Sequence, residues 1–298
     1  MILIDEPVWP AHGTLWGHVV SDMSLEELHA FARAHGLSAR GFDHDHYDYP
    51  LARRDDLLAA GAALVEGTDL VRRLVASGLR VRPAQKTPSR EEASDRLHAA
   101  WSAVLPGHEA LRDELLARWG EPHRRYHDQR HLASCLAALG ALGCDDRLVH
   151  LGAWFHDAVY DGVPGQDEER SASLAEDLLG GVLPPQEVAE VARLVRLTAT
   201  HDTAGDDARG AHLLDADLSI LGALPGRYHV YVRDVRLEYG HVPEDDFAVG
   251  RAGVLRHLLA LDPLYRTPTG AQLWARQAHA NMTAELAALN VLSRGVAG

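Results

Sequence analysis

The stretch AWFHDAVYDGV, residues 153–163, places His156 and Asp157 side by side in an apolar segment. Burying an unpaired charge costs several kcal/mol, so buried ionisable groups are usually paired or bound to a metal. The preceding residues, LVHLGAW (148–154), have the spacing of a helix that faces a core. We therefore expect both side chains to bind one cation, with the remaining ligands supplied from other parts of the chain.

Three further segments carry candidate ligands. His127 and His131, in RRYHDQRHL (124–132), are four residues apart and would share one face of a helix. Asp215 and Asp217 precede the apolar end of HLLDADLSILG (212–222), and His201 ends EVARLVRLTATH (190–201). Imidazole and carboxylate groups are ligands for hard and borderline divalent metals. The sequence therefore predicts a metal site shared by several helices.

The order of these segments resembles the HD superfamily of metal-dependent phosphohydrolases, and more closely one uncharacterised branch of it. The segments are PHRRYHDQRH (122–131), WFHDAVYD (154–161), ERSA (169–172) preceded by Glu168, TATH (198–201), DADLSILG (215–222) and EYGHV (238–242). The resemblance covers about residues 90–292 and implies an all-α domain. It implies metal-binding roles for His131, His156, Asp157 and Asp217, and it leaves a second metal open.

Other residues are candidates for proton transfer. Asp157 is expected to accept a proton from the attacking water as well as to bind the metal. Asp161 follows it by four residues and would share its helical face if the helix continued, so it is a candidate general acid or base. Glu169 is a weaker candidate for that role. The simpler interpretations are a turn aspartate before Gly162 and an exposed glutamate at a helix start.

Phosphate recognition requires cationic or amide donors. The expected substrate-binding residues are Arg124, His127, His201 and Arg251. His127 could instead be a metal ligand or support one, and each arginine has an ordinary salt-bridge interpretation.

The resemblance implies hydrolysis of a phosphate ester, from a nucleotide or another small phosphorylated metabolite, by attack of a metal-bound hydroxide. The divalent metal would be Mn, Co, Ni, Mg, Fe or Zn, because ligand type alone does not select among them. Two other functions stay open. A diiron HD-type oxygenase would need more ligands, such as His127 and His201. A non-catalytic metal or nucleotide sensor is disfavoured because the ligand set is intact.

The N-terminal part has a different pattern. MILI (1–4) is typical of a buried strand, and SLEELHAFARAHG (24–36) begins with a capping box formed by Ser24 and Glu27. MILIDEPVWPAHGTLWGHVVSD (1–22) and FDHDHYDYP (42–50) resemble a small bacterial domain family of unknown function, over about residues 1–82. The second segment could hold a separate cation, but a solvated, charged loop is the simpler interpretation. The residues concerned are Asp43, His44, Asp45, His46 and Asp48.

We therefore predict an α+β protein with two domains. Residues 1–82 would form a small α/β domain, 83–89 a Pro-containing linker, and 90–298 an all-helical HD-type domain. The start of the chain lacks the pattern of a signal peptide and no segment resembles a membrane span, which favours the cytoplasm. The formal net charge of −14 disfavours binding to nucleic-acid polymers. Assembly into a homo-oligomer is left open.

Overall fold

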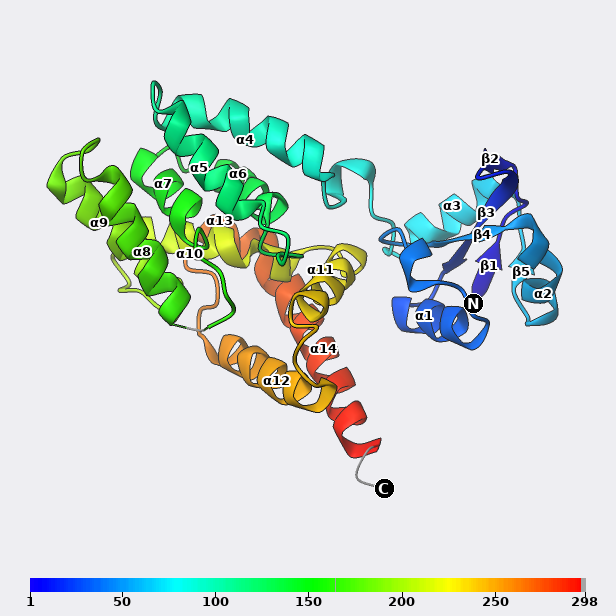
Figure 1. Ribbon diagram of the computed structural model, residues 1–298. Coiled ribbons are helices and arrows are strands. Elements are labelled where there is room, and N and C mark those ends of the chain that lie inside the picture. The colour runs from blue at the N-terminus through cyan, green and yellow to red at the C-terminus, as the bar shows by residue number, and fades with distance from the viewer. Residues whose placement is uncertain (164, 296–298) are drawn as a thin grey trace. The chain divides into compact units, whose positions relative to one another are not determined.

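The computed structural model describes residues 1–163 and 165–295. The chain falls into two compact units. The first, the sheet unit, contains residues 1–86 and 224–230; the second, the helical unit, takes 87–223 and the rest of the chain from 231. An N-terminal sheet followed by a mostly helical region confirms the predicted α+β class (Figure 1).

The sheet has five short strands. They are β1 (Ile2–Ile4), β2 (Trp9–Ala11), β3 (Thr14–Ser21), β4 (Tyr47–Pro50) and β5 (Ala63–Leu64). β3 pairs antiparallel with β1 and β2 along one edge and with β4 along the other, and β5 joins β1 in parallel. The predicted strand at MILI is confirmed as β1, whose three residues are buried.

Helices cover both faces of this sheet (Figure 1). They are α1 (Leu25–Ala34), α2 (Arg54–Ala59) and α3 (Gly67–Ala76), with short 3-10 turns at Ala39–Gly41 and Leu51–Arg53. Successive strand residues face opposite sides. Val19 of β3 accordingly packs with Leu28 of α1, whereas Val20 packs with Leu70 and Leu74 of α3.

The capping box predicted at Ser24 forms only in part, whereas a second one, at Ser89, is complete. Ser89 and Glu92 form a complete one, in which each side chain accepts a hydrogen bond from the other residue's backbone N–H. Ser24 caps α1 by accepting from Glu27 N at 3.2 Å. The Glu27 carboxylate instead binds the amino terminus at 2.9 Å, so the reciprocal half of that capping box is replaced by an ion pair.

The helical unit begins after a 3-10 turn at Pro83–Gln85. Its helices are α4 (Arg90–Val104), α5 (Glu109–Trp119), α6 (Gln129–Ala141), α7 (Arg147–Phe155), α8 (Gln166–Leu179), α9 (Pro185–Leu197), α10 (Ala208–Asp217), the part of α11 (Pro225–Glu238) from residue 231, α12 (Glu244–Ala260), α13 (Pro268–Gly270) and α14 (Arg276–Gly295). A 3-10 turn at Leu218–Gly222 follows α10, and a π-helical turn at Ala271–Ala275 precedes α14. None of the helices among the described residues is long and apolar enough to span a bilayer.

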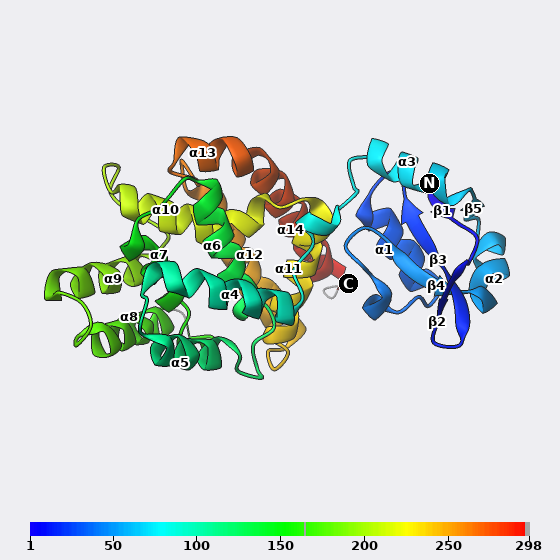
Figure 2. The same cartoon turned by 90° about the horizontal axis from the view of Figure 1, so that it is seen from above.

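Three tryptophans fix the packing of the first helices. Trp101 of α4, Trp119 of α5 and Trp154 of α7 are completely buried. The rings of Trp101 and Trp154 meet edge to face at 4.8 Å, and Trp119 Nε1 donates to the backbone oxygen of Trp154 at 2.9 Å. Helix α6 lies among α4, α7 and α10 (Figure 2). The segment with the His156–Asp157 pair therefore leaves α7 inside the core.

Separate cores predict separate folding. A fragment of residues 90–298 should be soluble and helical without residues 1–82, because the tryptophan core belongs entirely to the helical unit. Circular dichroism and thermal unfolding of the fragment test the domain boundaries. Aggregation of the fragment, with cooperative unfolding of the full chain, would show that the two units fold together.

Candidate metal centre

Three helices that begin with an aspartate N-cap bring the candidate ligands together. Asp128 caps α6 by accepting from Arg130 N, and Asp146 caps α7 by accepting from Leu148 N. Asp207 caps α10 by accepting from Gly210 N. Such caps fix where a helix starts and hence which way each later residue points. The ligands lie in the first turn of α6 and at the C-terminal ends of α7 and α10.

The four predicted ligand side chains converge at one point. His131 Nε2 lies 3.1 Å from His156 Nε2 and 3.1 Å from Asp217 Oδ1. His156 Nε2 lies 3.2 Å from Asp157 Oδ2 and 3.5 Å from Asp217 Oδ1. Two ligand atoms about 2.1 Å from one ion are separated by about 3.0–3.4 Å in octahedral or tetrahedral geometry. The spacings among His131, His156 and Asp217 therefore suit ligands of one divalent cation, and Asp157 Oδ2 lies somewhat farther off, 3.7 Å from His131 Nε2.

The tautomer of His156 also suits a ligand. Its Nδ1 lies 2.8 Å from the backbone oxygen of Ala153, which can only accept, so Nδ1 carries the hydrogen. The lone pair of the neutral ring is then on Nε2, the nitrogen that faces the other ligands. Both imidazoles are almost inaccessible, with 4% of His131 and 1% of His156 exposed. The donor set is thus buried and oriented toward its own centre.

The two carboxylates make the cluster a favourable place for positive charge. Burial raises the pKa of Asp157 and of Asp217, but His156 outweighs this effect and holds both pKa values below their usual range. Burial lowers the pKa of His156, yet the two carboxylates raise it well above its ordinary value. For His131, burial prevails and the pKa is lowered. Without a cation, a proton on His156 partly offsets the two carboxylates.

Cys135 and His201 extend the donor set. Cys135 lies one turn after His131 on α6, and its Sγ is 3.6 Å from His131 Nε2. Cys135, His131, His156 and Asp217 form a compact group of potential metal ligands. His201 Nε2 lies 3.0 Å from Asp217 Oδ2, on the carboxylate oxygen that does not face His131. His201 was predicted from the sequence, whereas Cys135 was not, although its spacing of four residues from His131 indicates the same helical face.

His127 is held beside the centre by a residue that the sequence analysis did not assign. Its Nδ1 donates to Glu238 Oε2 at 2.6 Å, and its ring stacks on Tyr160 at 4.2 Å. Glu238 Oε1 accepts from the backbone N–H groups of Arg125, Tyr126 and His127. The carboxylate at the end of α11 therefore orients the loop before α6. The only sequence signal for this role was the position of Glu238 at the start of EYGHV.

Arg124, predicted to contact phosphate, instead supports the backbone. Its side chain is completely buried. The guanidinium donates to the backbone oxygens of His127 at 3.0 Å, Asp157 at 2.7 Å and Ala158 at 3.2 Å. It therefore connects the loop before α6 to the turn after α7, and these contacts hold the backbone of His127 and of Asp157 beside the candidate centre.

Asp161 and Glu169, two of the three predicted acid–base residues, lie away from the cluster, whereas Asp157 is part of it. Helix α7 ends at Phe155, so Asp161 does not share a helical face with Asp157. Asp161 is 55% exposed and pairs with Arg170 at 2.5 Å, while Glu169 pairs with Arg196 on the surface at 2.7 Å. Between α7 and α8, Asp167 Oδ2 accepts hydrogen bonds from the backbone N–H groups of Asp161 and Val163, and these bonds hold the turn.

A cavity of about 560 Å³ opens onto the centre. Its lining includes Asp157, Asp217, His127, His201 and Arg251. This volume is within the range of about 300–1,000 Å³ that is typical of small-molecule sites. The guanidinium of Arg251 is paired with Glu285 at 2.7 and 3.0 Å.

Glu168 also lines this cavity, although the sequence analysis favoured its neighbour Glu169. Glu168 Oε2 is buried without a hydrogen-bond partner. Leaving such an oxygen unsatisfied costs about 1–3 kcal/mol, which makes it a candidate for a contact with a ligand.

Comparison with known proteins gives one match. Residues 2–77 match a family model described as "Protein of unknown function (DUF4031)". This match supports the resemblance of the N-terminal part to a small family of unknown function. The chain matches no curated protein and no solved structure.

Replacing Asp157 by alanine should remove most of the stabilisation by metal. A cation that binds only the folded state at 100 times its Kd stabilises it by about 2.7 kcal/mol. The Tm of the wild-type protein should therefore rise with Mn²⁺, and the Tm of Asp157→Ala should rise much less. Paired melting curves with chelator and with Mn²⁺ measure the difference, and Asp177→Ala, an exposed aspartate on α8, is the control. An equal loss of Tm in both buffers would mean that Asp157 only pairs with protein groups.

Metal affinity should increase with pH. The raised pKa of His156 means that the metal-free centre keeps a proton well above pH 6.5, and a cation must displace this proton. Affinity should therefore rise by up to about tenfold per pH unit between about pH 6.5 and the raised pKa. The depressed pKa values of Asp157 and Asp217 place their own titration below this window. Calorimetric titration in two buffers of different ionisation enthalpy measures the released proton, and pH-independent binding would contradict the expectation.

Proposed function

We propose that the helical unit is a metal-dependent hydrolase of small phosphate esters. The observation that carries this proposal is the convergence of two imidazoles with two carboxylates, Asp157 and Asp217, which line a cavity. Nitrogen and oxygen donors in this combination suit Mn, Fe, Co, Ni or Zn. The order of the ligand segments, which resembles HD phosphohydrolases, supports the same reaction class.

A bound cation would supply Lewis acidity toward a phosphoryl oxygen and lower the pKa of a water molecule. The chain's own residues would hold it through His131, His156, Asp157 and Asp217. Asp157 lines the cavity, so its carboxylate is also placed to accept a proton from water. Arg124 and Glu238 act as positioning residues, because they fix the backbone on either side of the ligands.

The cavity offers few fixed positive charges to a substrate. Arg251 is paired with Glu285, so the metal and the imidazoles of His127 and His201 would receive most of the phosphate charge. Four tyrosines on the walls, Tyr126, Tyr160, Tyr231 and Tyr239, provide aromatic surface for the rest of the molecule. This arrangement favours a small ester whose phosphate points toward the metal.

Glu168 is our candidate for the general acid that protonates the leaving oxygen. It reaches the cavity, whereas Asp161 and Glu169 are engaged in ion pairs outside it. The buried Oε2 of Glu168 has no hydrogen-bond partner among the described residues, so its carboxyl is available to a group bound in the cavity.

A diiron oxygenase is the second candidate. Asp217 is flanked on Oδ1 by His131 and on Oδ2 by His201, as in a carboxylate that bridges two metals. Two iron ions per helical unit, magnetically coupled in electron paramagnetic resonance, would favour oxygenation. One ion per helical unit together with phosphate release would favour the hydrolase.

Phosphate release from p-nitrophenyl phosphate and a nucleotide panel, with added Mn²⁺, Co²⁺ or Ni²⁺, tests the proposal. His156→Ala should lower activity by more than about 100-fold together with metal content, because it removes a ligand. Glu168→Gln should lower kcat by about 10²–10⁴-fold and leave metal content unchanged. Asp177→Ala serves as the control and should retain full activity.

The same measurements distinguish the ways in which the proposal could fail. Equal activity of Glu168→Gln and the wild type would remove Glu168 from the mechanism but leave the hydrolase standing. Metal-loaded protein that releases no phosphate from any substrate of the panel, yet binds nucleotides, would favour a sensor.

A further inference from the structure

The sheet unit contains a second group of metal-ligand side chains. His18 of β3 and Asp48 of β4 are directly opposite in the antiparallel register. His46 precedes Asp48 by two residues, a spacing that places both on the same side of an extended chain. His18 Nε2 lies 4.0 Å from Asp48 Oδ1, and His46 Nε2 lies 3.5 Å from the same oxygen. The strand pairing therefore brings two imidazoles and one carboxylate together.

Each of these imidazoles is fixed from behind by a buried carboxylate. His18 Nδ1 donates to Asp5 Oδ2 at 2.8 Å, and His46 Nδ1 donates to Asp45 Oδ1 at 2.6 Å. Because Nδ1 is the donor in both rings, the lone pair of each neutral ring is on Nε2, facing Asp48. Metal-bound histidines usually have this carboxylate support, which fixes the ring and raises its basicity.

The backbone makes room for this support. Gly17 precedes His18, and a Cβ atom there would lie 2.8 Å from the ring of Tyr49 and 3.0 Å from Asp5 Oδ1. Glycine therefore permits Asp5 to approach β3. Asp5 also accepts from the backbone N–H of His18 at 2.6 Å, so one carboxylate orients both the strand and the ring.

Asp45 shows that the loop before β4 is not simply solvated. The prediction of a solvated, charged loop is wrong for this residue, which is completely buried. Asp45 Oδ2 accepts from Val81 N at 2.7 Å and pairs with Arg80 at 3.2 Å. Several partners thus hold the carboxylate that supports His46.

We infer that His18, His46 and Asp48 form a binding site for a divalent transition-metal ion. Their ligand atoms lie within 4.8 Å of one another. Ions with tetrahedral ligands at about 2.1 Å have ligand separations of about 3.4 Å, so His18 must move toward Asp48 to complete the site, whereas His46 is already at nearly this separation from it. Two imidazoles and one carboxylate select Fe²⁺, Co²⁺, Ni²⁺ or Zn²⁺ over Mg²⁺ and Ca²⁺, which prefer oxygen ligands.

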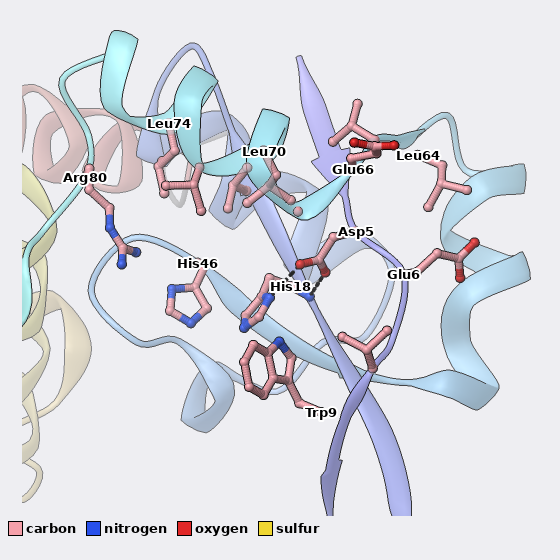
Figure 3. A pocket seen from close by; sticks show the side chains of 15 residues that line it. Asp5, Glu6, Trp9, His18, His46, Leu64, Glu66, Leu70, Leu74 and Arg80 are labelled. Carbon is pink, nitrogen blue, oxygen red and sulfur yellow. Dashed lines mark hydrogen bonds and ion pairs between the residues drawn. The ribbon is translucent and has the colours of Figure 1, made fainter.

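The site borders a cavity, so the ion remains accessible. His18, His46 and Asp5 line a cavity of about 780 Å³ (Figure 3). The apolar part of its wall includes Trp9 of β2 and Leu70 of α3. Three protein ligands leave at least one coordination position for water or a small ligand, as in catalytic rather than structural zinc sites.

Metal content of full-length variants tests this inference. Protein freed of metal with chelator is loaded with Co²⁺ and desalted, and cobalt per chain is measured by mass spectrometry. The wild type should bind one more ion than Asp48→Asn or His46→Gln, and both variants should lose a ligand-field absorption band. Asp48 has a half-exposed side chain, so its amide replacement should leave folding intact by circular dichroism. The helical unit is unchanged in every variant, so its own metal cancels from the difference.

Two further variants distinguish a built site from adventitious binding. Asp5→Asn should still bind the ion but about 10- to 100-fold more weakly, as expected for a supporting carboxylate. His12→Asn removes an exposed imidazole from the same unit, at a position with φ of 49° that asparagine tolerates, and should bind as the wild type does. Excess Mg²⁺ should not displace Co²⁺.

The inference is overturned if the wild type, Asp48→Asn and His46→Gln hold the same cobalt with the same absorption. In that case the imidazoles and carboxylates form only a hydrogen-bonded cluster. Displacement of Co²⁺ by Mg²⁺ would likewise overturn the choice of a transition metal.

Discussion

The candidate centre depends on the carboxylates of Asp157 and Asp217, which lie largely out of solvent next to two buried imidazoles. Two largely buried carboxylates close to the same imidazoles are costly unless positive charge lies between them. A divalent cation would neutralise the pair, whereas a single proton on His156 offsets only half of their charge. The surrounding structure reduces the freedom of these groups: aspartate caps set the starts of α6, α7 and α10, and Arg124 ties together the backbone on which His127 and Asp157 lie.

Much of this centre could be predicted from the sequence, because its candidate ligands lie near the ends of helices and the sequence indicates where those helices begin and end. Asp128 before α6 and Asp146 before α7 are preferred N-cap residues, and the apolar spacing between caps indicates which face is buried. The four candidate ligands were named from this local information together with the resemblance of their order to HD phosphohydrolases, and their metal binding stays a prediction. The capping box at Ser89 and the strand at MILI were predictable for the same reason, since both depend on interactions within a few residues.

The functions assigned to Asp161, Glu169 and Arg124 depend on the path of the chain after a helix ends. A helix that continued would have placed Asp161 beside Asp157, but α7 stops at Phe155 and Asp167 holds the following turn. That turn directs Asp161 to solvent, and in α8 it is Glu168 rather than Glu169 that reaches the cavity. Glu238 is 111 residues from His127, and no local pattern connects them. Long-range contacts of this kind decide which residues support the candidate ligands.

Both candidate centres place carboxylates beside imidazoles, but the groups that surround them differ. In the helical unit, His156 Nδ1 donates to a neutral backbone carbonyl, so after a cation displaces the proton of His156 the centre carries the charges of Asp157 and Asp217, which one divalent ion would cancel. In the sheet unit, Asp5, Asp45 and Asp48 supply three negative charges around His18 and His46. Arg80 pairs with Asp45, so a divalent ion would again bring the total near zero. His18 and His46 are therefore supported by carboxylates in the unit where Arg80 compensates part of the added negative charge. His156, which is more deeply buried, is supported by a neutral backbone carbonyl that adds no charge.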